Sequence, residues 1–309
     1  MKRILAVALV LTILTGALCS CTQQNKDENK ILLVTSFYPV YIFTKNVVNG
    51  IDDISVQCMA EQNIGCLHDY QLLSRDARLI SDADAFIING AGMEAFLEDV
   101  YSSVEDLTVI DSSKNVELLE ICDEHHDGHH SEEESEHHEH SVNSHIWMSP
   151  KNAIIQVENI ADELVALYPQ YKEKIESNKE IYIAELNALN EELSVSAKAL
   201  KGKNIITFHE SYDYLAKEYS FNVIATVESH EGGEPSAKGL AELTEKINKH
   251  NVTVLFTEPD YKGSAATVLS KETGAEICVL NPVTKGDSSL TSYEDIMREN
   301  MNVILKAVG

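Results

Sequence analysis

The feature that most restricts the fold of this chain is a regular alternation of short apolar, β-branched segments with longer segments of helical character. Strands that are separated by helix-length segments form parallel sheets with crossover helices. The sequence therefore predicts an α/β fold of two lobes, each with a mainly parallel four-stranded sheet flanked by helices. The eight predicted strands lie at 31–37, 54–59, 85–90, 107–111, 204–209, 221–227, 252–259 and 276–282.

Two long helical segments separate the two sets of strands. The first starts after Ser149, a favourable N-cap residue, with Pro150 at the first helical position. The second carries apolar residues at helical spacing over 170–201 and ends before Gly202. At 1.5 Å per residue it would be roughly 48 Å long, enough to join two lobes rigidly. We therefore predict an N-terminal lobe over 30–168, a linking helix over 169–202 and a C-terminal lobe over 203–309.

The first residues have the pattern of an export signal. A short basic start is followed by an almost wholly apolar stretch from Ile4 to Leu18, which is too short to cross a bilayer comfortably. Leu18, two small residues and Cys21 resemble the lipobox of bacterial lipoproteins. We predict that 1–21 is a signal peptide and that a lipidated Cys21 anchors the chain to the outer face of the bacterial cytoplasmic membrane. The alternative is an ordinary secretory signal with an incidental cysteine.

The charge of the chain argues against one class of partner. The 309 residues carry a formal net charge of −26, and Lys and Arg form no cluster of the kind that phosphate groups require. We therefore expect no nucleic-acid partner. A strong negative charge suits an exported soluble protein, which we expect to be a monomer, and raises the local concentration of cations.

The cysteines leave two interpretations open. After Cys21, the chain retains Cys58, Cys66, Cys122 and Cys278. Cys58 and Cys66 could form a disulfide outside the cell, but four cysteines in so long a chain are not a disulfide framework. Buried or free thiols are an equally good interpretation.

A stretch from Cys122 to His140, "CDEHHDGHHSEEESEHHEH", contains seven of the twelve histidines. It has low complexity and no apolar periodicity, and we predict a mobile loop over 122–141. Such a loop can bind several zinc ions weakly but cannot hold one rigid tetrahedral site without supporting contacts. We interpret it as an accessory capture or sensing loop; the alternative is a solvated charged insertion with incidental metal affinity. Its candidate ligands are His125, His126, His129, His130, His137, His138 and His140.

Three other histidines share a type of position. His209 ends a predicted strand, His68 follows the loop after the 54–59 strand, and His145 precedes a helix. Ligand sites of parallel α/β folds form where loops leave the carboxyl ends of strands. Three imidazoles at that edge suit zinc, whereas manganese, calcium and magnesium prefer oxygen ligands. His230 and His250 are interpreted as a loop residue and a residue of a surface helix.

These motifs together resemble a known family over nearly the whole length of the chain, from about 31 to 308. The family comprises the metal-binding lipoproteins that serve ABC importers for zinc and manganese, and the resemblance is to its zinc branch. It implies two α/β lobes joined by a long helix, with zinc bound between the lobes. The matching motifs are "TSFYPVYIFTKNVVNG", "GCLHDYQ", "HIWMSP", "TFHESYDYLAKEYSF", "HEGGEPSAKGL" and "LFTEPDY".

The resemblance implies that His68, His145 and His209 bind the metal. The manganese branch usually has a carboxylate at the position of His209, so the resemblance favours zinc. Many members supply an aspartate where this chain has Asn281, and an uncharged amide is a poor zinc ligand. The fourth position would then be filled by water, by Asn281 or by Glu210. The chain also departs from the family before two of the ligands, at Cys66-Leu67 and Asn143-Ser144.

Three classes of function compete for a chain with these motifs. The first is an extracytoplasmic receptor that captures Zn²⁺ and delivers it to the permease and ATPase subunits of an ABC importer; a receptor for manganese or another divalent metal is a variant. Zinc binding by neutral imidazoles should weaken as the pH falls through about 6.5. The second is a zinc hydrolase, but His209-Glu210 does not extend to an HExxH motif because residue 213 is Asp. The third is an extracellular zinc buffer or a cell-adhesion protein.

Overall fold

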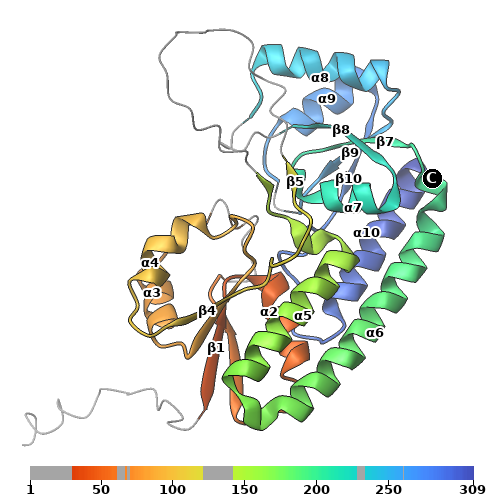
Figure 1. The fold of residues 1–309 in the computed structure, drawn as a ribbon. Coiled ribbons are helices and arrows are strands. Elements are labelled where there is room, and N and C mark those ends of the chain that lie inside the picture. Colours follow the sequence, from red (N-terminus) through yellow and green to blue (C-terminus); the bar gives the residue numbers. More distant parts are fainter. Residues whose placement is uncertain (1–29, 61–66, 68–69, 121–141, 228–233, 260) are drawn as a thin grey trace, which may run out of the picture. The chain divides into compact units, whose positions relative to one another are not determined.

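The computed structural model describes residues 30–60, 67, 70–120, 142–227, 234–259 and 261–309 (Figure 1). The predicted signal peptide with Cys21, His68, His230 and the histidine-rich loop lie outside these residues. Two parallel four-stranded sheets form, with strand orders β2-β1-β3-β4 and β10-β9-β7-β8. Each strand falls within a predicted segment, which confirms the α/β class and both sheets. The strands are β1 (Ile31–Thr35), β2 (Ile54–Cys58), β3 (Ala85–Ile88), β4 (Thr108–Asp111), β7 (Asn204–Thr207), β8 (Asn222–Thr226), β9 (Val254–Thr257) and β10 (Glu276–Val279).

The first sheet is covered on both faces. The successive residues Leu33 and Val34 of β1 point to opposite faces, and both side chains are fully buried. Figure 1 shows α3 and α4 on one side of this sheet and α2 and α5 on the other. Apolar side chains must therefore recur along these strands without alternation, as the sequence has them. The helical elements are α2 (Tyr38–Val47), α3 (Ser74–Ser81), the 3-10 turn Ala95–Leu97, α4 (Glu98–Ser102) and α5 (Pro150–Leu167).

The second sheet separates two groups of apolar side chains. Leu255 of β9 packs with residues of α8 and α9, whereas its neighbours Val254 and Phe256 belong to the larger core shared with the first sheet. This alternation follows from the two-residue period of a strand. The sheet thus has helices on both faces. These are α7 (Asp213–Tyr219), α8 (Ala237–Lys249) and α9 (Ala265–Thr273), with α10 (Ser292–Val308) at the end of the chain.

The long segment between the sheets is helical from Pro169 to Leu200. It consists of α6 (Lys172–Ser196) with a 3-10 turn at each end, Pro169–Tyr171 and Ala197–Leu200. The helix stops before Gly202, whose φ of +71° favours glycine. The predicted long helix is therefore confirmed. Its buried stripe consists of Ile175, Tyr182, Leu186, Leu189 and Leu193.

The C-terminal helix α10 packs against α2 and α6. Tyr293 of α10 is fully buried, and its ring lies 5.1 Å from that of Phe43 in α2. The hydroxyl group of Tyr38 donates to Ser292 Oγ at 2.6 Å, and the Asn46 amide donates to the Leu290 carbonyl at 3.0 Å. Residues of α2, α6 and α10 belong to one apolar core, which also contains residues of both sheets.

Several smaller features bear on the remaining expectations. Two short strands, β5 (Leu119–Glu120) and β6 (Val142–Asn143), form an antiparallel pair that the sequence patterns did not predict.

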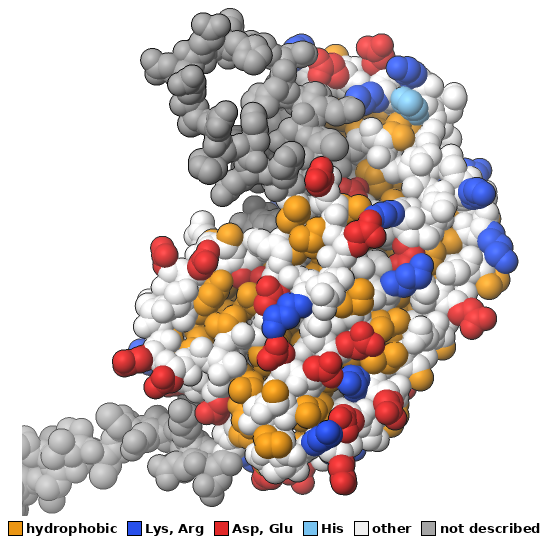
Figure 2. All heavy atoms as spheres, in the orientation of Figure 1, with side chains coloured by type: hydrophobic (Ala, Val, Ile, Leu, Met, Phe, Trp, Pro, Cys, Tyr) orange, Lys and Arg blue, Asp and Glu red, His pale blue; other side chains and the backbone are white. Residues whose placement is uncertain are grey.

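Cys58 and Cys278 are free thiols, and burial raises the pKa of the Cys58 thiol to about 12. On the face shown in Figure 2, Lys and Arg side chains lie dispersed among Asp and Glu. Among the described residues, none of the helices combines the length and apolar character needed to cross a membrane.

Candidate metal centre

Two of the three predicted histidine ligands come from segments far apart in the sequence. His209 follows β7 by two residues and directly precedes the 3-10 turn Glu210–Tyr212, which leads into α7. His145 precedes the 3-10 turn Ile146–Met148, after which Ser149 caps α5 by accepting a hydrogen bond from the Asn152 amide. The N-cap and the first-turn proline predicted for this helix are thus present. A helical turn thus begins directly after each of the two histidines and restricts the backbone there.

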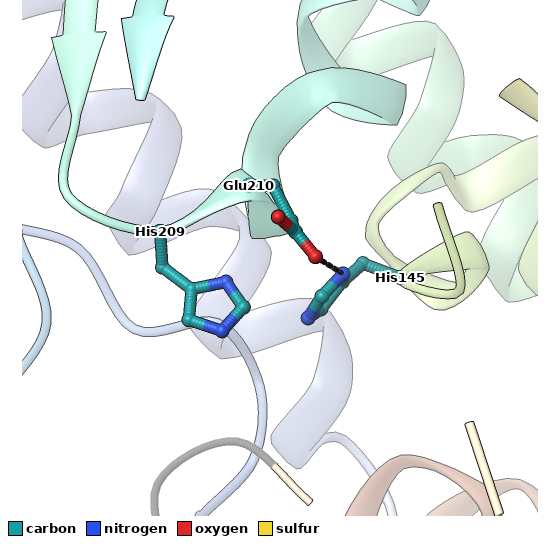
Figure 3. Close-up of side chains that lie close together, drawn as sticks. All are labelled: His145, His209 and Glu210. Carbon is teal, nitrogen blue, oxygen red and sulfur yellow. Dashed lines mark ion pairs between the residues drawn. The ribbon is translucent and has the colours of Figure 1, made fainter. Parts of the chain in front are cut away.

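His145, His209 and Glu210 lie together. One potential ligand atom from each residue lies within 4.8 Å of the others. The two imidazole rings approach edge to face, with their centroids 4.8 Å apart, and Glu210 Oε1 lies 4.0 Å from His145 Nδ1. Figure 3 shows both rings facing a common space with the Glu210 carboxylate beside His145. Ligand atoms around one tetrahedral zinc ion are about 3.3 Å apart, a spacing that this limit includes.

The centre is largely withdrawn from solvent. His145 is fully buried and Glu210 is 8% exposed, whereas His209 is partly exposed. The ring of Trp147 lies 5.1 Å from that of His145 and forms one wall. Trp147 is itself held by the hydrogen bond from its Nε1 to the Pro282 carbonyl, at 2.8 Å. Burial of this kind strengthens the interaction between a cation and its ligands.

Asn143 joins the two segments that carry the histidines. Its Oδ1 accepts a hydrogen bond from the His145 backbone amide and lies 2.9 Å from His145 Nδ1. Its Nδ2 donates to the Glu210 carbonyl at 3.0 Å and to Asp213 Oδ2 at 3.1 Å. Burial raises the pKa of the Asp213 carboxyl to about 6, and the hydrogen bond from Asn143 opposes that shift.

His209 has a comparable contact with its own segment. Ser211 Oγ lies 3.1 Å from His209 Nδ1 and donates to Glu258 Oε1, also at 3.1 Å. Glu258 directly follows β9, so the second sheet supports this ring through Ser211. The sequence interpretation did not single out Asn143, Ser211 or Glu258 for such roles. For Asn143 and Ser211, the only sequence signal for these roles was a position two residues from a histidine.

The remaining candidate ligands differ in what the structure says of them. Glu210, one of the three options for the fourth position, lies in the cluster with the two histidines. Asn281, another option, uses its side chain within its own loop: Nδ2 donates to the Lys285 carbonyl at 3.1 Å, and Oδ1 accepts from the Val283 amide at 2.9 Å. His68 and the histidines of the 122–141 segment lie outside the described residues. All ligand assignments therefore remain predictions.

Imidazole nitrogen and carboxylate oxygen together define what this centre can do. Zinc sites are built from His, Cys and carboxylate ligands, whereas calcium and magnesium sites are built from oxygen alone. A neutral imidazole binds a metal through whichever ring nitrogen lacks a hydrogen, and this depends on the contact at the other nitrogen. The described residues therefore offer ligand atoms of the kinds that a borderline-soft divalent cation prefers.

Residues 33–307 match the family described as ZnuA, zinc-uptake complex component A, periplasmic. The chain belongs to this family. The match includes the described segments that carry His145, His209 and Glu210, and it agrees with the resemblance noted from the motifs. Members of the family are thus components of zinc-uptake complexes.

Individual relatives give the same result. The chain is 32% identical over 305 residues to the zinc-binding lipoprotein AdcA of Streptococcus pneumoniae serotype 4, covering 95% of this chain and 60% of AdcA. It is 31% identical over 294 residues to the high-affinity zinc uptake system protein ZnuA of Bacillus subtilis, covering 92% and 90% of the two chains. A crystal structure of ZnuA superimposes with a TM-score of 0.78 at 25% identity, covering 91% of this chain and 100% of that one. The chain spans about three-fifths of the length of the streptococcal relatives.

Proposed function

We propose that this chain is an extracytoplasmic solute-binding protein that captures Zn²⁺ and delivers it to the permease and ATPase subunits of an ABC importer. The observation that carries the proposal is the convergence of His145, His209 and Glu210 from two distant segments. Membership of a zinc-uptake family and the zinc-binding relatives support the same function. We infer binding rather than catalysis, with zinc as the cargo.

The ligand set that we propose is His68, His145 and His209, with Glu210 in the fourth position. The resemblance of "GCLHDYQ" to the family motif supports His68. Glu210 is preferred to Asn281 because its carboxylate lies with the two imidazoles, whereas the Asn281 amide shapes the loop after β10. Two or more imidazoles favour zinc over manganese. The histidine-rich segment remains an accessory in this proposal.

The cellular setting is proposed with the function. A relative named as a lipoprotein supports export and a lipid anchor at Cys21, with the signal segment cleaved immediately before Cys21. The two sheets and the long helix support a division into lobes at 30–168 and 203–309, joined by 169–202. A monomer is proposed as the binding unit.

Calorimetric titration with Zn²⁺ tests the site. The chain from Thr22 onward would be compared with a variant that lacks 123–140, with His209→Ala and with His250→Ala. His250 is an exposed residue at the end of α8 and serves as the matched control. We expect one tight site in the intact chain, the deletion variant and the control, and its loss in His209→Ala.

The opposite pattern would reject the assignment. If tight binding disappears with 123–140 and survives His209→Ala, the histidine-rich segment is the binding site and the chain acts as a zinc buffer. Repeating the titration with Mn²⁺ tests the choice of cargo. Tighter binding of Mn²⁺ than of Zn²⁺ would contradict a zinc receptor.

A further inference from the structure

The two described histidines of the proposed site, His145 and His209, share a detail of their surroundings. In each case Nδ1 lies within hydrogen-bond distance of a side-chain oxygen two residues away in the sequence. For His145 the partner is Asn143 Oδ1 at 2.9 Å, and for His209 it is Ser211 Oγ at 3.1 Å. The partner precedes one histidine and follows the other. The common contact therefore does not come from a repeated sequence motif.

The orientation of the Asn143 amide is fixed by its other neighbours. Nδ2 faces two oxygen acceptors, the Glu210 carbonyl and Asp213 Oδ2, while Oδ1 receives the backbone N–H of His145. Exchanging the amide oxygen and nitrogen would place oxygen against oxygen and would turn the NH₂ group toward an N–H donor. Oδ1 can only accept, so the hydrogen bond at His145 Nδ1 requires a hydrogen on that nitrogen.

A similar argument applies to Ser211, which is 1% exposed. Its hydroxyl group has one hydrogen, and this hydrogen is donated to the Glu258 carboxylate. The oxygen is then left to accept, and the hydrogen of the second contact must come from His209 Nδ1. Glu258 thus orients the hydroxyl group, and the hydroxyl group orients the imidazole.

We propose that Asn143 and Ser211 are positioning residues that hold the hydrogen of each neutral imidazole on Nδ1 and leave the lone pair of Nε2 for the cation. The part concerning the cation rests on the proposed zinc-binding function, whereas the hydrogen positions do not depend on it. In an unconstrained neutral histidine the hydrogen prefers Nε2. Without these contacts each ring would therefore have to change tautomer before it bound through Nε2.

Nitrogen NMR of the zinc-free chain from Thr22 onward reads the hydrogen positions directly. Long-range ¹H–¹⁵N spectra at pH 8, above the usual range of imidazole titration, distinguish a ring nitrogen that carries hydrogen from one that does not. Loss of signals in His145→Gln and His209→Gln assigns the two rings. We expect hydrogen on Nδ1 in both. Hydrogen on Nε2 in either ring of the native chain would overturn the proposal for that ring.

Two substitutions applied in a crossed design separate positioning from general disruption. Ser211→Ala should shift the tautomer of His209 and leave His145 unchanged, and Asn143→Leu should do the reverse. Asn178→Leu is the matched control, because the buried Asn178 amide also donates two hydrogen bonds. These join α6 to the carbonyls of Val47 and Asn49, and neither involves a histidine. This variant should shift neither ring. If both rings shift in each variant, or neither shifts, the proposal fails.

Zinc titration then measures the effect on affinity. Loss of a group that orients a metal ligand typically weakens binding about 10–100-fold, and we expect this for Ser211→Ala and Asn143→Leu but not for Asn178→Leu. Unchanged affinity together with an altered tautomer would show that the contacts do not serve binding. If the native chain has both hydrogens on Nδ1 but binds no zinc, the proposed function fails and the positioning holds. If it binds zinc with hydrogen on Nε2, the function holds and the positioning fails.

Discussion

Glu94 is a carboxyl group enclosed by the carboxyl ends of two strands of the first sheet. Its Oε1 accepts from Ser36 Oγ at 2.7 Å and from the backbone amide of Asn89 at 2.8 Å, and its Oε2 accepts from the backbone amide of Gly90 at 3.0 Å. Gly90 has a φ of +79°, and a Cβ there would overlap Asp111 Oδ1. Burial raises the pKa of Glu94 to about 7 despite the three hydrogen bonds.

This raised pKa predicts how stability depends on pH. Between about pH 4.5 and 7 the unfolded chain releases the proton of Glu94 while the native state retains it, so the free energy of unfolding falls as the pH rises. A shift of this size corresponds to a loss on the order of 3 kcal/mol, complete above pH 7. Glu94→Gln should remove this part of the slope in urea unfolding measured from pH 4.5 to 7.5.

An exposed carboxyl nearby provides the control for that experiment. Glu98 lies on the surface in the first turn of α4, so Glu98→Gln should leave the pH dependence of unfolding as it is in the native chain. Equal slopes in Glu94→Gln and in the native chain would show that Glu94 is ionised when folded.

The sequence predicted some residues of the candidate metal centre and did not predict others. His209 was identifiable because strand ends carry ligands in parallel sheets, and Glu210 because it adjoins His209. Asn143, Ser211 and Glu258 act through hydrogen bonds between separate segments. Whether an Asn or Ser side chain reaches a histidine depends on side-chain rotamers and on chain directions, which a single sequence does not specify.

At the scale of elements, α6 combines one fully buried face with a solvated one. Leu186 is 0% exposed, while Ile181 on the same helix is 56% exposed. Leu186→Ala should lower the free energy of unfolding by about 2–5 kcal/mol, because it removes buried methyl groups and leaves a cavity. Ile181→Ala, the matched control, should change it by at most about 0.5 kcal/mol. Urea unfolding followed by circular dichroism compares the two; equal effects would contradict the assigned helix face.

Elements with strong local signals were predictable. The eight strands and the start of α5 at Ser149 and Pro150 follow from β-branched runs, capping and proline geometry, all of which act over a few residues. β5 and β6 have two residues each, too few for a periodic pattern. The packing of α10 on α2 was also beyond prediction, since an amphipathic pattern shows that a face is buried but not which element covers it.

At the scale of the whole molecule, one apolar core contains residues of both sheets, including Leu33 and Phe86 of the first and Ile205 and Phe256 of the second. Sheets that share a core lose their packing together. We therefore expect calorimetry of the zinc-free chain to show one cooperative unfolding transition. Two separate transitions would show that the lobes unfold independently.

Zinc should stabilise this single folded unit by mass action. At a free concentration one hundred times Kd, binding to the native state alone adds about 2.7 kcal/mol to the free energy of unfolding. The melting temperature should rise on adding zinc and return on adding a chelator. His250→Ala should behave like the native chain, whereas a comparable rise in His209→Ala would contradict the assigned site.

The packing of α10 on α2 has a consequence for the timing of folding during synthesis. The core beside β1 and α2 lacks Tyr293 and Ile304 until the last helix has been made. At the usual rate of translation, roughly 10–40 s separate β4 from Tyr293. For the exported chain that we propose, a core completed only by its final helix would delay folding until synthesis is nearly finished.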